Sequence, residues 1–110
     1  MRFYVDPGRL RQRLSLQAAD QPVDGLGGHA LVWREIAVVF GLIEPVAAKS
    51  LVEADQRLTR LTHRVTLRAR DDIAAGMRLV KNDRAFLIRT RQDPDESGRY
   101  LVCQVEEDEP

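Results

Sequence analysis

The side chains best suited to chemistry are few in this sequence and lie far apart. The only histidines are His29 and His63, and the only cysteine is Cys103. A zinc site needs several such ligands at close spacing, so we expect no metal centre and no cofactor. His63 falls among the apolar positions of a strand-like stretch, where a core or interface histidine is a simpler interpretation than a ligand. Cys103 shares its parity with Leu101 and Val105, which predicts a small buried side chain.

Carboxylates are the other candidates for chemistry. Asp71 and Asp72 are adjacent and could bind a divalent ion, although such pairs in turns usually face water. Asp93, Asp95 and Glu96 resemble the first ligands of a calcium loop, but the later ligand positions of that loop are missing. No pairing of a base with a nucleophile is recognisable, so we expect that the protein is not an enzyme.

Arginines gather on one side of segment 62–70. Arg64, Arg68 and Arg70 share a parity there, so they would share one face of an extended strand. Three interpretations stay open: a solvated outer face, pairing with an acidic neighbour, and non-specific contact with DNA phosphates. We expect the acidic neighbour to be the tail of another subunit, because opposite charges steer encounter and fix register. That candidate tail spans 106–110 and contains Glu106, Glu107, Asp108 and Glu109.

Length and charge limit the class of protein. The chain has 110 residues, with 17 basic and 17 acidic side chains that cancel at neutral pH. This length suits one domain with a thin core, and zero net charge argues against a protein whose main role is gripping a phosphate backbone. No apolar run is long enough for a membrane helix, and the start does not resemble a signal peptide. The single cysteine fits a reducing compartment.

Periodicity predicts a mainly β fold, a small antiparallel barrel or sandwich of about six strands. Asn82 and Asp83 form the expected two-residue turn of a hairpin. Gly41 would mark a bulge or a close backbone approach, and Pro45 should end the second strand. The expected elements are an N-terminal arm at 1–8, strands at 9–17, 31–43, 62–70, 77–81, 84–91 and 100–105, and a loop at 19–30.

One window favours a helix. Segment 47–58 is rich in good helix formers, and Leu51, Ala54 and Leu58 recur at helical spacing. Its apolar stripe is narrow, so the expected helix is short and weakly anchored, within an excursion that spans 46–61.

The ordered series of segments resembles the phage head–tail joining family, which comprises the head-closure or stopper proteins of tailed phages and related gene transfer agents. The resemblance rests on the strand LRQRLSLQ, the loop ending in GG, Trp33, and the strand IAVVFGLIEPV. It continues through LTHRVTLRAR and the ending from IAAGMRLVKNDR to YLVCQVEE. Asn82-Asp83 stands where the family often has Asp-Gly.

The resemblance implies one connector domain over 1–110, a small β-barrel that assembles into a ring, commonly of six copies. Such a ring lies between a portal-side adaptor protein and the tail terminator or tail tube protein, and it surrounds packaged double-stranded DNA. It implies no catalytic residue and no membrane partner, and it places the protein in a phage-like particle assembled in the bacterial cytoplasm. The excursion is our candidate for the channel or inter-ring element; its polar residues are Glu53, Asp55, Gln56, Arg57 and Arg60.

Other functions stay open. The closest are a neighbouring adaptor or tail terminator, although adaptors of this kind are usually helical. A small nucleic-acid-binding barrel would need basic and aromatic residues interleaved on one face, and most aromatic residues here are expected in the core.

Overall fold

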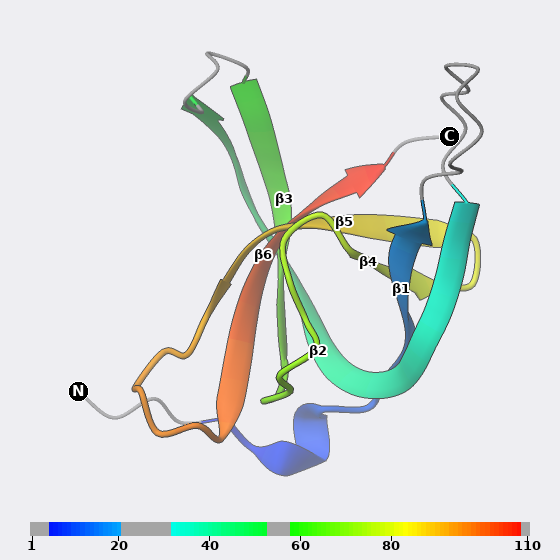
Figure 1. Cartoon of the computed structure of the whole chain (residues 1–110). Helices are drawn as coiled ribbons and strands as arrows, with labels where there is room; N and C mark the ends of the chain where they lie inside the picture. Colours follow the sequence, from blue (N-terminus) through cyan, green and yellow to red (C-terminus); the bar gives the residue numbers. More distant parts are fainter. Residues whose placement is uncertain (1–4, 21–31, 53–57, 109–110) are drawn as a thin grey trace.

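Six antiparallel strands close into a barrel in the computed structural model, which describes residues 5–20, 32–52 and 58–108 (Figure 1). The order around the barrel is β1-β2-β3-β6-β5-β4, and β4 pairs back with β1. This confirms the mainly β class. The described residues contain no α-helix. They contain one 3-10 turn, η1, at Pro7–Arg9, which overlaps the end of the arm expected at 1–8. The strands are β1 (Gln12–Asp20), β2 (Val32–Val52), β3 (Leu58–Arg68), β4 (Arg78–Lys81), β5 (Arg84–Gln92) and β6 (Tyr100–Asp108).

A single apolar cluster fills the barrel. Leu14 and Leu16 of β1 are fully buried, as their shared parity predicts. Thr66 of β3 has the parity of Arg64 and Arg68 but is also buried. No helix in the described part of the chain has the length and apolar character to cross a membrane. Other fully buried members of the cluster are Val65, Ile73, Leu79, Phe86, Ile88, Cys103 and Val105.

The long strand β2 belongs to two halves of the barrel wall, and Gly41 is where they meet. Gly41 is the Cα partner of Gln12 in β1 and of Leu67 in β3. A Cβ atom at Gly41 would lie 3.0 Å from the Thr66 carbonyl oxygen, so the close backbone approach expected from the sequence is confirmed. The absence of a side chain lets β2 curve from one partner strand to the other.

Two expectations about segment 45–58 are wrong. Pro45 does not end β2, because the strand continues to Val52. The register changes between Pro45 and Lys49, so the proline that cannot donate to the ladder lies at an irregularity. The expected helix over 47–58 is replaced by strand pairing between the ends of β2 and β3, with Val52 opposite Leu58. Cross-strand pairing overrides the helical propensity of this window.

The C-terminal strand is longer than expected. β6 continues through Asp108, and Glu106, Glu107 and Asp108 pair with β5, so these three residues are part of the sheet. The β4–β5 turn follows the prediction: Lys81 pairs with Arg84, and Asn82 adopts the left-handed φ of 56°.

Candidate functional site

The β2–β3 hairpin extends beyond the barrel (Figure 1). β1 pairs with β2 only as far as Gly41, and β6 pairs with β3 only from His63 onward. Beyond Gly41 in β2 and before His63 in β3, the two strands pair only with each other in the described residues. The outer backbone edges of the hairpin are therefore open. Arg60 lies on it and is exposed. The other candidate channel residues, Glu53, Asp55, Gln56 and Arg57, lie outside the described residues.

The base of the hairpin is held by Thr62, a residue that sequence reasoning did not single out. The Thr62 hydroxyl accepts a hydrogen bond from the Glu107 backbone N–H at 2.8 Å. It also lies 3.5 Å from the Val105 carbonyl oxygen, to which it can donate. One side chain thus supplies the contacts that the next step of the β3–β6 ladder would otherwise provide. The sequence signal was weak, since threonine is common on either face of a strand.

His63 packs next to this point and is half-buried, which fits the interpretation of a core or interface histidine better than that of a ligand. Its Nδ1 lies 2.9 Å from the Thr62 hydroxyl oxygen. Its ring meets the Phe86 ring edge-on, with centroids 5.1 Å apart. Burial lowers the pKa of His63. The nearby Glu107 carboxylate raises this pKa and offsets part of the shift, whereas the Arg84 guanidinium lowers it further. His29 lies outside the described residues.

The acidic residues of β6 already have partners within the chain. Arg84 donates to both Glu107 carboxylate oxygens, at 2.8 and 3.1 Å, and its guanidinium lies 5.0 Å from the centroid of the Phe86 ring. This hydrogen bonding lowers the pKa of Glu107. Arg89 donates to Glu106 at 2.8 Å. Asp108 is exposed and has no ion pair with a described residue, and Glu109 lies outside that set.

The arginines of β3 are not brought together with these acids. Arg64 donates to Glu44 at 3.3 Å, and Arg70, in the loop after β3, donates to both oxygens of Asp72. Arg68 is exposed, forms no ion pair within the described ranges, and lies opposite Tyr100 at the start of β6. The acids lie at the other end of that strand, so any pairing of Arg68 with them would have to join two copies.

In the remaining carboxylate clusters, Asp72, Asp93 and Asp95 have structural partners. Hydrogen bonding to Arg70 lowers the pKa of Asp72. The Asp93 carboxylate accepts from the Gly98 backbone N–H at 2.7 Å, which closes the β5–β6 loop. Asp95 accepts hydrogen bonds from Ser97 and Arg99, and these contacts, Ser97 first, lower its pKa to about 2. In the part of the chain that the structure describes, no three His, Cys, Asp or Glu side chains converge as a metal site.

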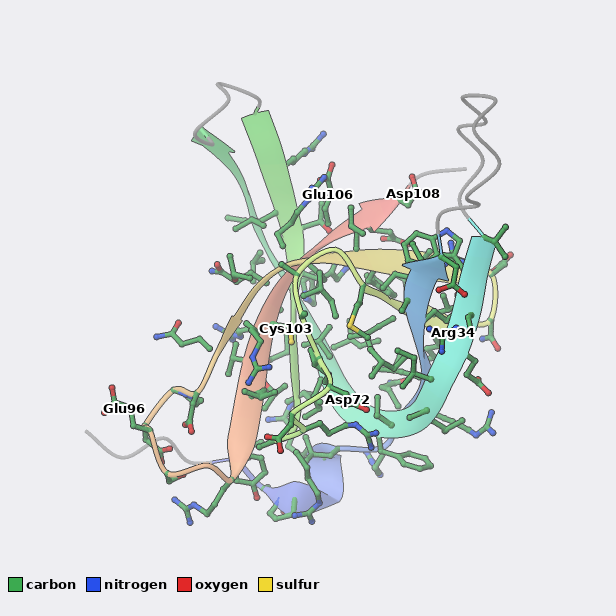
Figure 2. The ribbon with its side chains drawn as sticks, in the orientation of Figure 1. Arg34, Asp72, Glu96, Cys103, Glu106 and Asp108 are labelled. Atoms are coloured by element: carbon green, nitrogen blue, oxygen red, sulfur yellow. The ribbon has the colours of Figure 1, made fainter. Side chains whose placement is uncertain are left out.

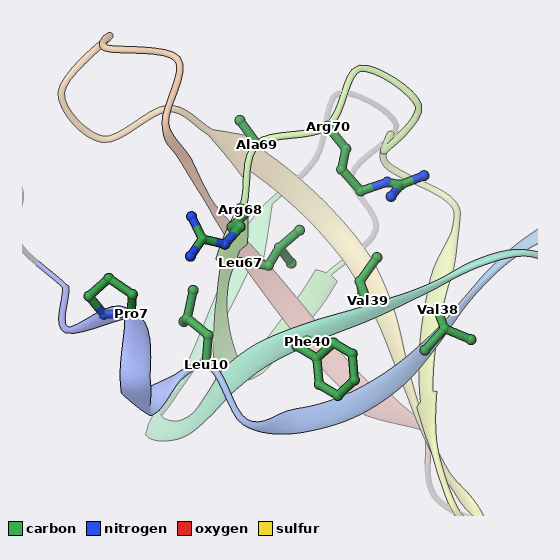
Figure 3. A pocket seen from close by; sticks show the side chains of 9 residues that line it. All are labelled: Pro7, Leu10, Val38, Val39, Phe40, Leu67, Arg68, Ala69 and Arg70. Atoms are coloured by element: carbon green, nitrogen blue, oxygen red, sulfur yellow. The ribbon is translucent and has the colours of Figure 1, made fainter.

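An exposed apolar face is the feature that the sequence did not predict. Val38 and Phe40 point outward from β2, although most aromatic residues were expected in the core. They line a groove with Pro7 and Leu10, and Arg68 lies at the same groove (Figure 3).

Figure 2 shows that Glu106 and Asp108 lie near one end of the molecule, while Asp72 and Glu96 lie toward the other.

Comparison with known proteins bears on this geometry. The model of a family described as phage head completion protein matches residues 5–108. The chain is similar to a protein in the virion of a native gene transfer agent particle, with 25% identity, a TM-score of 0.67, and coverage of 91% of this chain and 96% of that one. The solution structure of protein SF1141 from Shigella flexneri 2a has a similar fold, with 23% identity, a TM-score of 0.62, and coverage of 92% and 96%. Curated protein sequences give no match.

Proposed function

Because the chain belongs to the phage head completion protein family, we propose that it closes the head of a tailed phage or gene transfer agent particle and joins it to the tail. The family is structural, so the protein is a non-enzymatic component of the virion. The match over residues 5–108 is the observation that carries the proposal, because it covers the barrel and both strands of the hairpin.

The proposed assembly is a ring of six copies. One side of the ring meets the portal-side adaptor protein, and the other meets the tail terminator or tail tube protein. The whole chain, 1–110, acts as one connector domain. The shape supports this role, since the closed barrel is a rigid body that can pack against neighbours, while the hairpin reaches beyond it.

The excursion at 46–61 is the proposed channel or inter-ring element. It contains the projecting hairpin, and Arg60 is exposed on it. Packaged double-stranded DNA would be contacted through its phosphates, without reading of bases. Acidic groups such as Glu53 and Asp55 repel DNA and let it slide, whereas Arg57 and Arg60 attract it, so the mixture suits a channel that retains DNA without binding it tightly.

Deletion of the gene in its source, followed by electron microscopy of the particles, tests this function. We expect separate tails beside heads that have lost their DNA. Heads that keep their DNA but carry no tail would instead favour a neighbouring joining component, such as a tail terminator. Joined particles still full of DNA would overturn the proposal and favour a nucleic-acid-binding barrel.

A further inference from the structure

The outer face of β2 carries a row of apolar side chains that the barrel leaves open. Ile36, Val38 and Phe40 are 36%, 38% and 52% exposed, and they alternate along the strand, so they share one side of it. We call these three residues the β2 face. Single exposed apolar side chains are common on proteins, but a contiguous row marks an interaction surface.

Two arginines without ion pairs border the β2 face. Arg13 is the Cα partner of Phe40 in the β1–β2 ladder and is exposed. Arg68 lines the same groove as Phe40, and its guanidinium extends toward Pro7 and Leu10 (Figure 3). Neither arginine forms an ion pair with another residue among 5–20, 32–52 and 58–108. Exposed Glu35 also borders this face, because it accepts a hydrogen bond from Ser15, the Cα partner of Val38. The surface that covers the face should therefore be apolar and should place a carboxylate opposite an arginine. Among the residues that the structure describes, the arginines with carboxylate partners are Arg34, Arg64, Arg70, Arg84, Arg89 and Arg99.

The chain carries an apolar hollow with an unpaired carboxylate elsewhere. Trp33 and Leu87 line this hollow of about 450 Å³, whose edge includes Asp108. Its charges balance: Arg89 donates to Glu106, and the Arg78 guanidinium, 4.3 Å from the Trp33 ring centroid, keeps its positive charge in the same hollow as Asp108. Asp108 is exposed and forms no ion pair in the described residues, so its carboxylate is available to a cation from another copy. We call it the Asp108 hollow.

We propose that the β2 face of one copy docks on the Asp108 hollow of a second copy of this chain, with Arg68 facing the partner's Asp108. This contact rests on the proposed function, because it is the lateral contact of the ring. The two surfaces are different patches of one molecule, so the contact is heterologous, the type from which closed rings are built. An aromatic side chain entering a hollow beside a desolvated charge pair is also the usual composition of an interface hot spot.

Charge reversal with rescue tests the contact in particles made by the source strain. Arg68→Glu alone and Asp108→Arg alone should each lower the yield of joined, DNA-filled particles by about tenfold or more, since each places like charges opposite one another. The double variant should restore the yield, because it reverses the pair. Asp71→Arg is the matched control, an exposed acid outside both surfaces, and should leave the yield unchanged. Phe40→Ser tests the apolar contact and should lower the yield. Val32→Ser is its control and should leave the yield unchanged, because Val32 is exposed but lies outside the β2 face.

The outcomes separate this proposal from the function itself. Single reversals without effect, or a double variant as defective as the singles, would overturn the contact between copies. The second result would mean that Arg68 or Asp108 meets a different virion protein. Neither result touches the head-closure function, which the gene deletion decides independently. Melting temperatures of the purified variants should match that of the parent protein, so that a lower yield reports assembly.

Discussion

The hydroxyl oxygen of Thr62 lies 2.8 Å from the Glu107 backbone nitrogen and accepts its hydrogen bond at the point where β3 leaves the barrel. The regular β3–β6 register begins one residue later, with His63 opposite Val105. A side chain therefore replaces the ladder bond that β3 would have to supply. This frees the backbone of β3 to continue outward with β2 as the projecting hairpin.

Removing that hydroxyl should destabilise the protein. In Thr62→Val the shape is kept, but the partly buried Glu107 N–H loses its acceptor. We expect a loss of about 1–3 kcal/mol in the free energy of unfolding, measured in urea. Thr62→Ser keeps the acceptor and is the control. If both variants unfold at the same urea concentration, the hydroxyl does not hold the base of the hairpin.

A methyl group at Gly41 should also be costly. The Cβ of Gly41→Ala would lie 3.0 Å from the Thr66 carbonyl oxygen and 3.3 Å from atoms of Leu14 and Val65, none of which can move freely. Overpacking of this kind costs about 1–3 kcal/mol. Gly8→Ala, whose Cβ would only touch the flexible Asp6 side chain, should change stability by less than about 0.5 kcal/mol. Equal thermal midpoints for the two variants would contradict the close approach.

Stability should fall on the acid side of neutrality in two steps. The folded pKa of His63 is lowered by burial, so the unfolded chain takes up this proton first as the pH drops below about 6.5. The folded pKa of Glu107 is lowered by Arg84, so its contribution is complete above about pH 4.3 and is lost as the pH falls through the folded value. Protonation of either group therefore lowers the free energy of unfolding as the pH falls.

Single substitutions should assign the two steps. His63→Phe should flatten the first fall in unfolding free energy, which begins just below about pH 6.5, and Glu107→Gln should flatten part of the fall below about pH 4.3. Glu96→Gln is the control, since Glu96 is exposed and forms no ion pair in the described residues. Parallel pH profiles for the parent and His63→Phe would exclude His63 as the source of the upper step.

Cys103 should be inert in the folded protein. Burial raises the pKa of its thiol to about 11, although the nearby Arg91 opposes this. Because only the thiolate reacts, modification by an aromatic disulfide reagent at about pH 8 should be at least about 100-fold slower than in the urea-unfolded chain. Fast, complete reaction of the native protein would show that the β6 strand opens readily.

Shortening the hairpin should separate assembly from DNA retention. Deletion of 53–57 should yield particles that join heads to tails yet lose their DNA, because the barrel stays intact while the proposed channel element is reduced. Replacing 53–57 by glycine and serine at the same length distinguishes reach from charge. Particles with the deletion that hold DNA normally would exclude this hairpin as the channel element. DNA content is measured by nuclease-protected DNA per head.

The alternation of apolar and polar residues predicted the mainly β class. Such alternation assigns successive residues to opposite sides of a strand, whatever the position of that strand in the fold. The parity of Leu14 and Leu16 identified core residues, and Asn82-Asp83 identified a tight turn. The helix predicted over 47–58 from local propensity was wrong. Helical propensity contributes only tenths of a kcal/mol per residue, and pairing with β3 outweighs it.

The candidate interface could not be predicted in the same way. Sequence identified Arg68 and the acids of 106–108 as opposite charges, but Arg84 and Arg89 neutralise Glu107 and Glu106 within one chain. Which charges stay unpaired depends on strand register, and register joins residues far apart in the sequence.

The sequence by itself determined the strand periodicity, the tight turn and the resemblance to a family, and it left Gly41 as either a bulge or a close backbone approach. Only the tertiary structure decided where β3 leaves the barrel, which face of β2 stays open, and that Asp108 lies at the far end of β6 from Arg68. The physical reason is that alternation specifies two faces of a strand, whereas closure of the barrel decides which of them is covered and by what.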